Sequence, residues 1–481
     1  MKLYQRGNVC IGEVNNNVLF QDMLLPHNRE TQKEKYIVVK KIKKRESKAM
    51  TKQIKNIFFS DEEKKLYLNN LHDNKELWYR AHTMEKTRDR ADGEFQRDYS
   101  RIMYASSFRR LQGKMQLLGI KPDQFFRNRL THSLEVAQIA RSIAYELGYS
   151  QEESFVVEAG ALAHDIGNPP FGHSGERKLH ELFEHAGGFE GNAQTLRILT
   201  SVEKKKKDFQ GLNLTYRTML SVVKYFHKYK EGNSLIYKKF IYDDDYNLLN
   251  DFVKENHIIV RTLDVQIVDI ADEIAYAAHD LEDGLRQKCY TIDEILQDFY
   301  NKYGNCDSFK RLEKIVKKCK KVSGYKTDNI DSSISSKLFR QELSSMLIHT
   351  LINDLGFIKI TEEEKAKRGS QFDKELGFKE YGDLAHGLKK ITYSCINHND
   401  AVYTYEKKGD IILERLVEFY RDNTLFLPPE YRVENFIHEK NEDKKMLQER
   451  LICDYISGMM DSYAISQYEK ITGEQFSKIV L

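Results

Sequence analysis

The chain has 481 residues, of which 40% are hydrophobic and 31% are charged, and its formal net charge at pH 7 is +3. This near-balance of charge decides nothing about nucleic acid, and the lack of any apolar run of about 18 residues predicts no membrane span. The first residues lack the apolar core of a signal peptide. The six cysteines form no CxxC pair, which indicates reduced thiols in a cytoplasmic protein and excludes a zinc ribbon, and the six prolines favour a mainly α-helical fold.

Residues 1–75 differ in pattern from the rest and are expected to form a small N-terminal extension. Val9, Ile11 and Val18 are spaced as in short strands, which predicts some β-structure there. The basic run 40–45 is typical of a solvated helix face or linker, and contact with a phosphate backbone is the alternative. A single-stranded DNA partner is therefore kept as a hypothesis for this extension.

The first strongly periodic segment begins near Leu130. Apolar residues recur every three to four positions up to Leu147, and Gly148 is a fitting C-cap, so a helix is predicted. His132 falls in its first turn, where a side chain can face a cleft. A lone histidine in such a place is more often structural than functional.

The segment His164–Glu176, with the sequence HDIGNPPFGHSGE, holds two histidines and two acidic residues. The residues before it are small and apolar, as in a buried helix end, and the glycines and prolines within it end any helix. We therefore expect His164 and Asp165 at the end of a helix, and His173 and Glu176 on the loop and turn beyond it. An adjacent His–Asp pair offers a nitrogen and an oxygen ligand for a divalent cation, although isolated pairs are usually accidental.

A later segment, 263–285, is predicted to be one helix with one apolar stripe. Asp272, Tyr276 and Asp280 lie roughly opposite that stripe, and Asp269 shares their face. A solvent-facing acidic surface is the ordinary alternative, but the small alanines around these residues favour a pocket. From the residues alone, the carboxylate that joins a site is either Asp269 or Asp272.

Together, His132, the His164–Asp165 pair and one late carboxylate form a ligand set that leaves positions open on a six-coordinate ion. An ion held in this way binds water and a phosphate oxygen, lowers the pKa of the water and neutralises charge on the phosphoryl group. His173 beside Glu176 would supply a poised acid or base. This arrangement predicts hydrolysis of a phosphoester or phosphoanhydride. The chain has no P-loop, Rossmann or GxSxG motif, so those other classes of site have no support.

The order His…His-Asp…Asp resembles that of the HD phosphohydrolase superfamily. The sequences of the segments around these residues are similar to those of the deoxyguanosinetriphosphate triphosphohydrolase family. The resemblance runs from about Trp78 to near the end of the chain. Its matching segments are EFQRDYSRI (94–102), FRRLQGKMQ (108–116), RLTHSLEVAQ (129–138), residues 161–176, EGNAQ (190–194), ADEIAYAAHDLED (271–283) and residues 454–464. The resemblance implies an HD-domain helical bundle over 76–290 and a helical C-terminal region over 291–481 that packs on this core.

The resemblance also implies roles for individual residues. His132, His164, Asp165 and Asp272 would hold one divalent metal ion, Mn²⁺, Mg²⁺ or a similar transition metal. Asp272 is chosen over Asp269 because it has a tyrosine four and an aspartate eight residues later, as the family pattern requires. His173 and Glu176 would be catalytic. The implied substrate contacts are Gln116, Arg129, Lys224, Lys239, Tyr276 and Asp280.

The implied activity is hydrolysis of deoxynucleoside triphosphates, dGTP foremost, to deoxynucleoside and inorganic triphosphate by attack of water on the α-phosphorus. A dNTP effector and a closed homo-oligomer, a tetramer or hexamer, belong to the same expectation. Two alternatives stay open. One is an HD-type nucleotidase or phosphodiesterase that acts on other phosphoesters, and the other is a sensor that binds nucleotides or single-stranded nucleic acid with minor hydrolysis.

Overall fold

The chain divides after residue 57 into two compact units. The computed structural model describes residues 59–82, 93–116, 127–204, 206–207, 209–229, 239–326, 330–397, 400–436 and 443–481, together with the backbone of residues 3–6, 9–14 and 17–22. The first unit contains an antiparallel sheet of the strands β1 (Leu3–Arg6), β2 (Val9–Val14) and β3 (Asn17–Asp22). The short strands expected near the N-terminus are thereby confirmed, and the basic run 40–45 lies outside the described residues. The predicted boundaries at residues 75 and 290 stay predictions.

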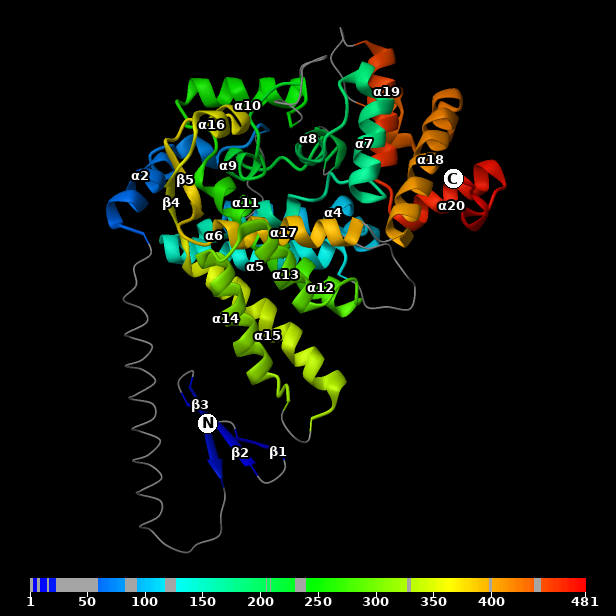
Figure 1. Ribbon diagram of the computed structural model, residues 1–481. Helices are drawn as coiled ribbons and strands as arrows, with labels where there is room; N and C mark the ends of the chain where they lie inside the picture. Colours follow the sequence, from blue (N-terminus) through cyan, green and yellow to red (C-terminus); the bar gives the residue numbers. More distant parts are fainter. Residues whose placement is uncertain are drawn as a thin grey trace, which may run out of the picture. The chain divides into compact units, whose positions relative to one another are not determined.

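The second unit is built around three mutually packed helices, α5 (Arg129–Leu147), α6 (Gln151–Ala163) and α11 (Leu263–Ala275), which lie at its centre in Figure 1. The ends of α5 are set by a capping box at Asn128 and by Gly148 in the left-handed conformation (φ 92°). A second capping box at Ser150 starts α6. Almost every residue of α11 is buried, so this helix forms the axis of the main hydrophobic core.

The helix predicted over 263–285 is confirmed, because helical backbone runs without a break from Leu263 to Arg286. Within it, α11 is followed by a π-helical turn, η6 (Tyr276–Asp280), and then by α12 (Leu281–Arg286). The sequence did not reveal this local change in the hydrogen-bonding step. Such turns are frequent at functional sites, and this one carries Tyr276 and Asp280.

Shorter elements surround the central helices. On the N-terminal side these are α2 (Asp61–His72), η1 (Lys75–Trp78), α3 (Glu94–Met103), α4 (Ser106–Arg110) and η2 (Leu111–Gly113). Between α6 and α11 lie α7 (Gly172–Leu182), η3 (Glu184–Ala186), α8 (Gly191–Arg197), η4 (Ile198–Val202), α9 (Tyr216–Leu220) and α10 (Asp243–Glu255).

The C-terminal region is helical, as expected, with one antiparallel hairpin that the sequence did not reveal. Its first part contains α13 (Ile292–Tyr303), α14 (Asp307–Val322), α15 (Ser332–Asn353), β4 (Leu355–Lys359), α16 (Glu362–Arg368), β5 (Lys374–Phe378) and α17 (Gly382–Asn397). β4 pairs with β5, and α16 connects the two strands. Helix α17 packs against η6, so the C-terminal region reaches the turn that carries Tyr276 and Asp280.

The last elements form a second core. They are α18 (Asp400–Asp422), η7 (Thr424–Phe426), η8 (Pro429–Tyr431), η9 (Val433–Asn435), α19 (Lys444–Ser457), α20 (Asp461–Thr472) and η10 (Phe476–Lys478). Figure 1 shows α7 among α18, α19 and α20, and Phe171, Leu179 and Phe183 are buried in their shared core. The predicted closing helix over 454–464 is wrong in one respect, because the chain breaks between α19 and α20.

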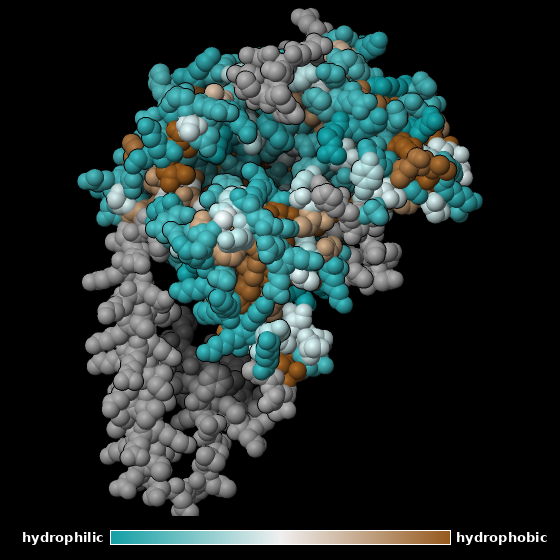
Figure 2. Space-filling model, in the orientation of Figure 1, coloured by the Kyte–Doolittle hydropathy of each residue, from teal (hydrophilic) through white to brown (hydrophobic). Residues whose placement is uncertain are grey.

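One face of the second unit is mainly polar. On the face shown in Figure 2, hydrophilic residues cover most of the surface and the hydrophobic areas are small and separate. None of the helices formed by the described residues combines the length and the hydropathy that a membrane-spanning segment needs.

Candidate active site

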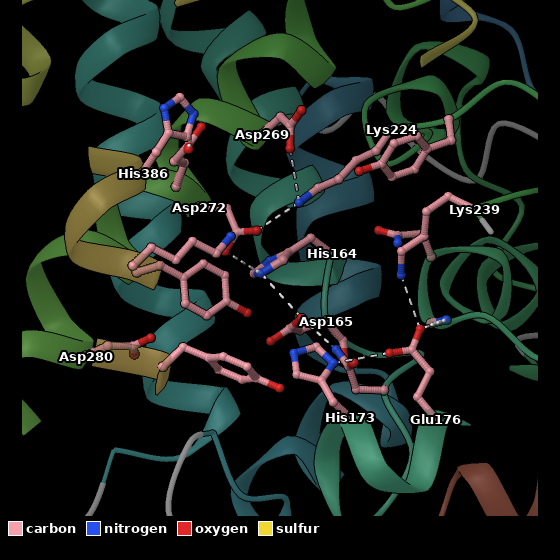
Figure 3. Close-up of a pocket in the computed structure, with 18 of the residues that line it drawn as sticks. His164, Asp165, His173, Glu176, Lys224, Lys239, Asp269, Asp272, Asp280 and His386 are labelled. Carbon is pink, nitrogen blue, oxygen red and sulfur yellow. Dashed lines mark hydrogen bonds and ion pairs between the residues drawn. The ribbon is translucent and has the colours of Figure 1, made fainter. Parts of the chain in front are cut away.

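A cavity of about 810 Å³ opens between the central helices and the C-terminal region. This volume is within the range of ordinary ligand pockets. Ten of the twelve predicted site residues line it: Gln116, His164, Asp165, His173, Glu176, Lys224, Lys239, Asp272, Tyr276 and Asp280. The other two, Arg129 and His132, are buried behind the cavity wall. Figure 3 shows the carboxylates of Asp165 and Asp272 converging on His164, with His173 and Glu176 beside them.

The predicted metal ligands come together from three helices. The ligand atoms of His132, His164 and Asp165 all lie within 4.8 Å of one another. Asp272 Oδ1 lies 3.1 Å from His132 Nε2 and 3.4 Å from His164 Nε2. Asp269, the alternative that the residues alone left open, faces Lys224 and Arg261 instead.

The orientation of His164 fits a metal ligand. Its Nδ1 donates to the carbonyl oxygen of Ala161 at 2.6 Å, one turn earlier in α6, so in the neutral imidazole the lone pair is on Nε2. This Nε2 is buried and has no hydrogen-bond partner among the described residues, yet it faces Asp272 Oδ1 and Asp165 Oδ1. A second hydrogen bond that orients the ring is typical of metal-binding histidines. Two imidazoles and two carboxylates therefore fit a divalent metal ion.

Cations lie behind the two carboxylates. Arg129 bonds Asp165 Oδ2 at 2.7 Å, and Lys224 bonds Asp272 Oδ2 at 2.8 Å, so the Oδ1 atoms stay directed to the histidines. Burial alone would raise the pKa of Asp165, but the charges of Arg129 and His164 outweigh it and hold this pKa well below its usual range. For Asp272, burial is likewise outweighed by the charge of Lys224 together with His164 and His132, so its pKa also lies well below the usual range. We call Arg129, His132, His164, Asp165, Lys224 and Asp272 the inner group.

The position of Arg129 bears on its predicted role. Its guanidinium is only 2% exposed and bonds a predicted metal ligand rather than lining the cavity. Contact with substrate stays a prediction for this residue, whereas its ion pair with Asp165 is a feature of the structure.

His173 and Glu176 both lie on α7, near its N-terminal end, and not on the loop and turn that the sequence suggested. The helix begins at Gly172 because Phe171 takes the left-handed conformation (φ 63°) as its N-cap. His173 Nδ1 lies 3.2 Å from Glu176 Oε2. An ionised carboxylate only accepts, so Nδ1 is the donor and Nε2 is left free.

The carboxylate of Glu176 is held from two further sides. It accepts a hydrogen bond from the backbone N–H of Gly191 at 3.1 Å and lies 3.3 Å from Lys239 Nζ. Lys239 in turn bonds the buried Glu190 at 2.5 Å. Burial opposes ionisation, but the hydrogen bond from His173 and the charge of Lys239 keep the pKa of Glu176 well below its usual range. Lys239, predicted as a substrate contact, thus also fixes the His173–Glu176 pair.

Two buried side chains of the cavity, Gln116 and Asp280, are suited to a polar, uncharged group. Gln116 is 8% exposed, and neither its amide oxygen nor its amide nitrogen has a hydrogen-bond partner among the described residues. A buried amide without partners is costly and indicates a place for a hydrogen-bonding ligand. Burial, reinforced by the charge of Asp283, raises the pKa of Asp280 to about 8.

Sequence reasoning missed one wall of the cavity. It is formed mainly by His386, Lys389, Lys390 and Tyr393 of α17, which we call the α17 row, together with Lys367 and Arg368 of α16. The ammonium of Lys389 lies 4.4 Å above the ring of Tyr276. The spacing of the α17 row places its members on one helical face, and this was the available signal. The row contains no motif, so from the sequence alone its charged residues could not be distinguished from an ordinary solvated helix face.

Comparisons with known proteins agree with this site. A family model described as "HD domain" matches residues 129–277, and one described as "Phosphohydrolase-associated domain" matches residues 379–470. These matches and the helical fold place the chain among the HD-domain phosphohydrolases, and it is a hydrolase of that class.

Similar proteins from bacteria define the family more closely. A "deoxyguanosinetriphosphate triphosphohydrolase-like protein 2" of Vibrio cholerae is 42% identical over 404 residues, which covers 83% of this chain and 93% of the relative. A protein of the same name from Deinococcus radiodurans is 33% identical over 84% of this chain and 98% of the relative. A "deoxyguanosinetriphosphate triphosphohydrolase-like protein" of Rickettsia bellii is 32% identical over 80% and 93%. The chain belongs to the deoxyguanosinetriphosphate triphosphohydrolase-like family.

Proposed function

We propose that this protein hydrolyses deoxynucleoside triphosphates, dGTP foremost, to deoxynucleoside and inorganic triphosphate. The observation that carries the proposal is that the metal-binding cluster, the His173–Glu176 pair and the lysines Lys224 and Lys239 all open on one cavity. A triphosphate needs both a metal and further cations, and the separate lysines favour it over a monophosphate. The names of the relatives support the same substrate class.

His132, His164, Asp165 and Asp272 of the inner group would hold the divalent ion, with Mn²⁺ or Mg²⁺ as the proposed metal. When bound, the ion supplies a water of lowered pKa and neutralises charge on the phosphoryl group. The Oδ1 atoms of Asp165 and Asp272 would be directed at the ion because Arg129 and Lys224 occupy the outer oxygens of the two carboxylates.

His173 is the proposed general acid. Cleavage between the α-phosphorus and the 5′-oxygen leaves an alkoxide that needs a proton, and a protonated His173 can donate one from Nε2 while Nδ1–H stays bonded to Glu176. Glu176 fixes the imidazole through Nδ1 and stabilises its charged form. Because Glu176 is itself held by Gly191 and Lys239, the ring needs little reorganisation during the reaction.

The end of the cavity near η6 would take the deoxyribose. Gln116 and Asp280 offer hydrogen-bonding groups for a hydroxyl, and Asp280 can donate as well as accept at neutral pH because its pKa is raised to about 8. The ring of Tyr276 would crowd a 2′-hydroxyl, so ribonucleotides would bind poorly.

The test is a product assay with each dNTP, offered singly and as a mixture, with Mg²⁺ or Mn²⁺. We expect inorganic triphosphate and deoxynucleoside in equal amounts. Mixtures are needed because a requirement for a dNTP effector would hide activity on single substrates, and the proposed homo-oligomer is measured in the same samples by light scattering. Pyrophosphate with a monophosphate, or phosphate released from a dNMP, would instead establish a different phosphohydrolase.

A further inference from the structure

The turn that carries His173 into the cavity contains a bulky residue in an unfavourable conformation. Phe171 has φ 63° and ψ 24°, and Gly172 follows with φ 60°. A large non-glycine residue in the left-handed region is strained, and such strain persists only where the surroundings hold it in place. The groups that hold Phe171 therefore help to set the position of His173.

One carboxylate of the C-terminal region holds this turn. Asp461, the first residue of α20, is 1% exposed, and its Oδ1 accepts the backbone N–H of Phe171 at 3.2 Å. Its Oδ2 accepts the backbone N–H of Met115 at 3.2 Å and the hydroxyl of Tyr405 at 3.3 Å. Met115 directly precedes Gln116. A single side chain thus ties together the backbone of two segments that reach the cavity from different sides.

The ring of Phe171 is held by the same region. It is fully buried in the core of α7 and α18–α20, and its edge packs on Tyr405 with the ring centroids 5.6 Å apart. Helix α18 approaches so closely at Gly409 that an added Cβ would lie 2.4 Å from Phe171 Cγ. Only glycine fits there without displacing the ring.

A buried lysine makes a parallel connection. Lys114 Nζ donates to the carbonyl oxygen of Ser457, at the end of α19, at 2.8 Å, and also to that of Asn168, in the segment between Asp165 and His173. The α19–α20 junction is therefore connected to the His164–Glu176 segment directly by Asp461 and also through Lys114.

We propose that Asp461 is a positioning residue for the reaction proposed above. Supported by Tyr405 and Gly409, it holds the Phe171 turn and the Met115 backbone, and so sets both His173 and Gln116 against the substrate. The C-terminal region thereby acts on the reaction through the backbone of the site, without itself touching the reacting atoms. This inference rests on the proposed function only for its kinetic consequence.

The first test replaces Asp461 by Asn in the full chain. An amide has one accepting oxygen, so Asp461→Asn leaves one of the two backbone N–H groups without a good acceptor. We expect hydrogen exchange at the amides of Phe171 and Met115 to accelerate about tenfold or more, with the amides of α5 unchanged. We expect kcat for the dNTP to fall about 10- to 100-fold, because small displacements of reacting groups cost rate. Ser462→Ala is the matched control, since Ser462 is the exposed neighbour of Asp461 on α20.

A second variant displaces the same turn without changing Asp461, and it covers the case in which Asp461→Asn does not fold. In Gly409→Ala the added Cβ pushes the Phe171 ring, and the better helix propensity of alanine offsets part of the cost of this overpacking. The same pattern of faster exchange and lower kcat is expected. Tyr405→Phe, which removes one hydrogen bond and keeps the ring, should give a weaker version.

The outcomes are separable. Unchanged exchange at Phe171 and Met115 in both Asp461→Asn and Gly409→Ala overturns the inference, and so does faster exchange with unchanged kcat. The exchange measurement needs no substrate. If the wild-type protein released no triphosphate from any dNTP while exchange at the turn still depended on Asp461, the proposed function would fail and the structural part of the inference would stand.

Discussion

Two walls of one cavity are built on opposite principles. Every member of the inner group is at most 8% exposed, and each carboxylate in it has a cation behind it and a histidine in front. The four members of the α17 row are exposed, and their contacts are few, such as Lys389 above the Tyr276 ring and His386 beside Glu273. The inner group is preorganised, whereas the α17 row can adjust.

The difference follows from dielectric screening. Charges buried together interact strongly and cannot rearrange without leaving one of them unpaired, which costs several kcal/mol in typical cases. Exposed charges interact weakly, and pairs of them contribute about 0–1 kcal/mol. Chemistry at a metal requires buried charges that cannot rearrange. Exposed charges that can move are compatible with binding a variable part of a ligand.

The largest expected effect comes from the inner group. Asp272→Asn removes a carboxylate that faces both histidines and leaves Lys224 with only Asp269 beside it. We expect Mn²⁺ affinity to fall about a hundredfold or more, with loss of nearly all hydrolysis. Metal binding is measured by Mn²⁺ titration followed by electron paramagnetic resonance, and activity by triphosphate release.

The same helix offers a matched control for that experiment. Asp269→Asn makes the same chemical change three residues earlier, at a carboxylate that contacts Lys224 and Arg261 but neither histidine. Its effect on Mn²⁺ affinity should stay below about tenfold. Equal losses in the two variants would mean that Asp272 has no special place in the inner group.

A second prediction compares two lysines across the cavity. Lys224→Ala deprives Asp272 and Asp269 of a buried cation, so the free energy of unfolding without metal should fall by about 3 kcal/mol. Lys389→Ala removes an exposed charge, so this energy should change by less than about 0.5 kcal/mol. For Lys389→Ala, KM should rise several-fold with kcat within about twofold. Urea denaturation in EDTA and steady-state kinetics measure these effects, and similar losses of stability in both variants would contradict the comparison.

The contrast also explains what the sequence could predict. His164 and Asp165 sit at the end of α6 as expected, because the glycines and prolines that follow stop the helix whatever the tertiary context. Asp272, Tyr276 and Asp280 were placed on one face by their spacing alone, and all three line the cavity. Their roles as ligands or substrate contacts were implied by family resemblance and stay predictions.

Other features depend on contacts between distant segments. Nothing local distinguishes His386 and Lys389 from solvated surface until α17 packs on η6. The left-handed Phe171 is stabilised by Asp461 and Gly409, far along the chain, so the sequence suggested a loop where α7 already begins. The π turn η6 left no trace in the apolar spacing. Motifs thus reveal the inner group, and only tertiary packing reveals the opposite wall.

The smallest expected effect is the pH dependence of stability that His386 contributes, and it tests how strongly the α17 row interacts with its surroundings. His386 Nε2 lies 2.6 Å from Glu273, and this hydrogen bond raises the pKa of His386 above its usual 6.5. When the pKa of a histidine is higher in the folded than in the unfolded state, protonation stabilises the fold. This contribution is fully present at pH values below the pKa of the unfolded state, and it is lost as the pH rises through the pKa of the folded state. The free energy of unfolding of wild type should therefore exceed that of His386→Gln at pH 5.5 and approach it at pH 8.5. Because the side chain is 54% exposed, the pH-dependent part should be no more than about 0.5 kcal/mol. Urea denaturation of both proteins at the two pH values measures this pH-dependent difference.

A difference of several kcal/mol would mean that the α17 row is as tightly built as the inner group, and the division of the cavity into a rigid and an adjustable wall would have to be abandoned.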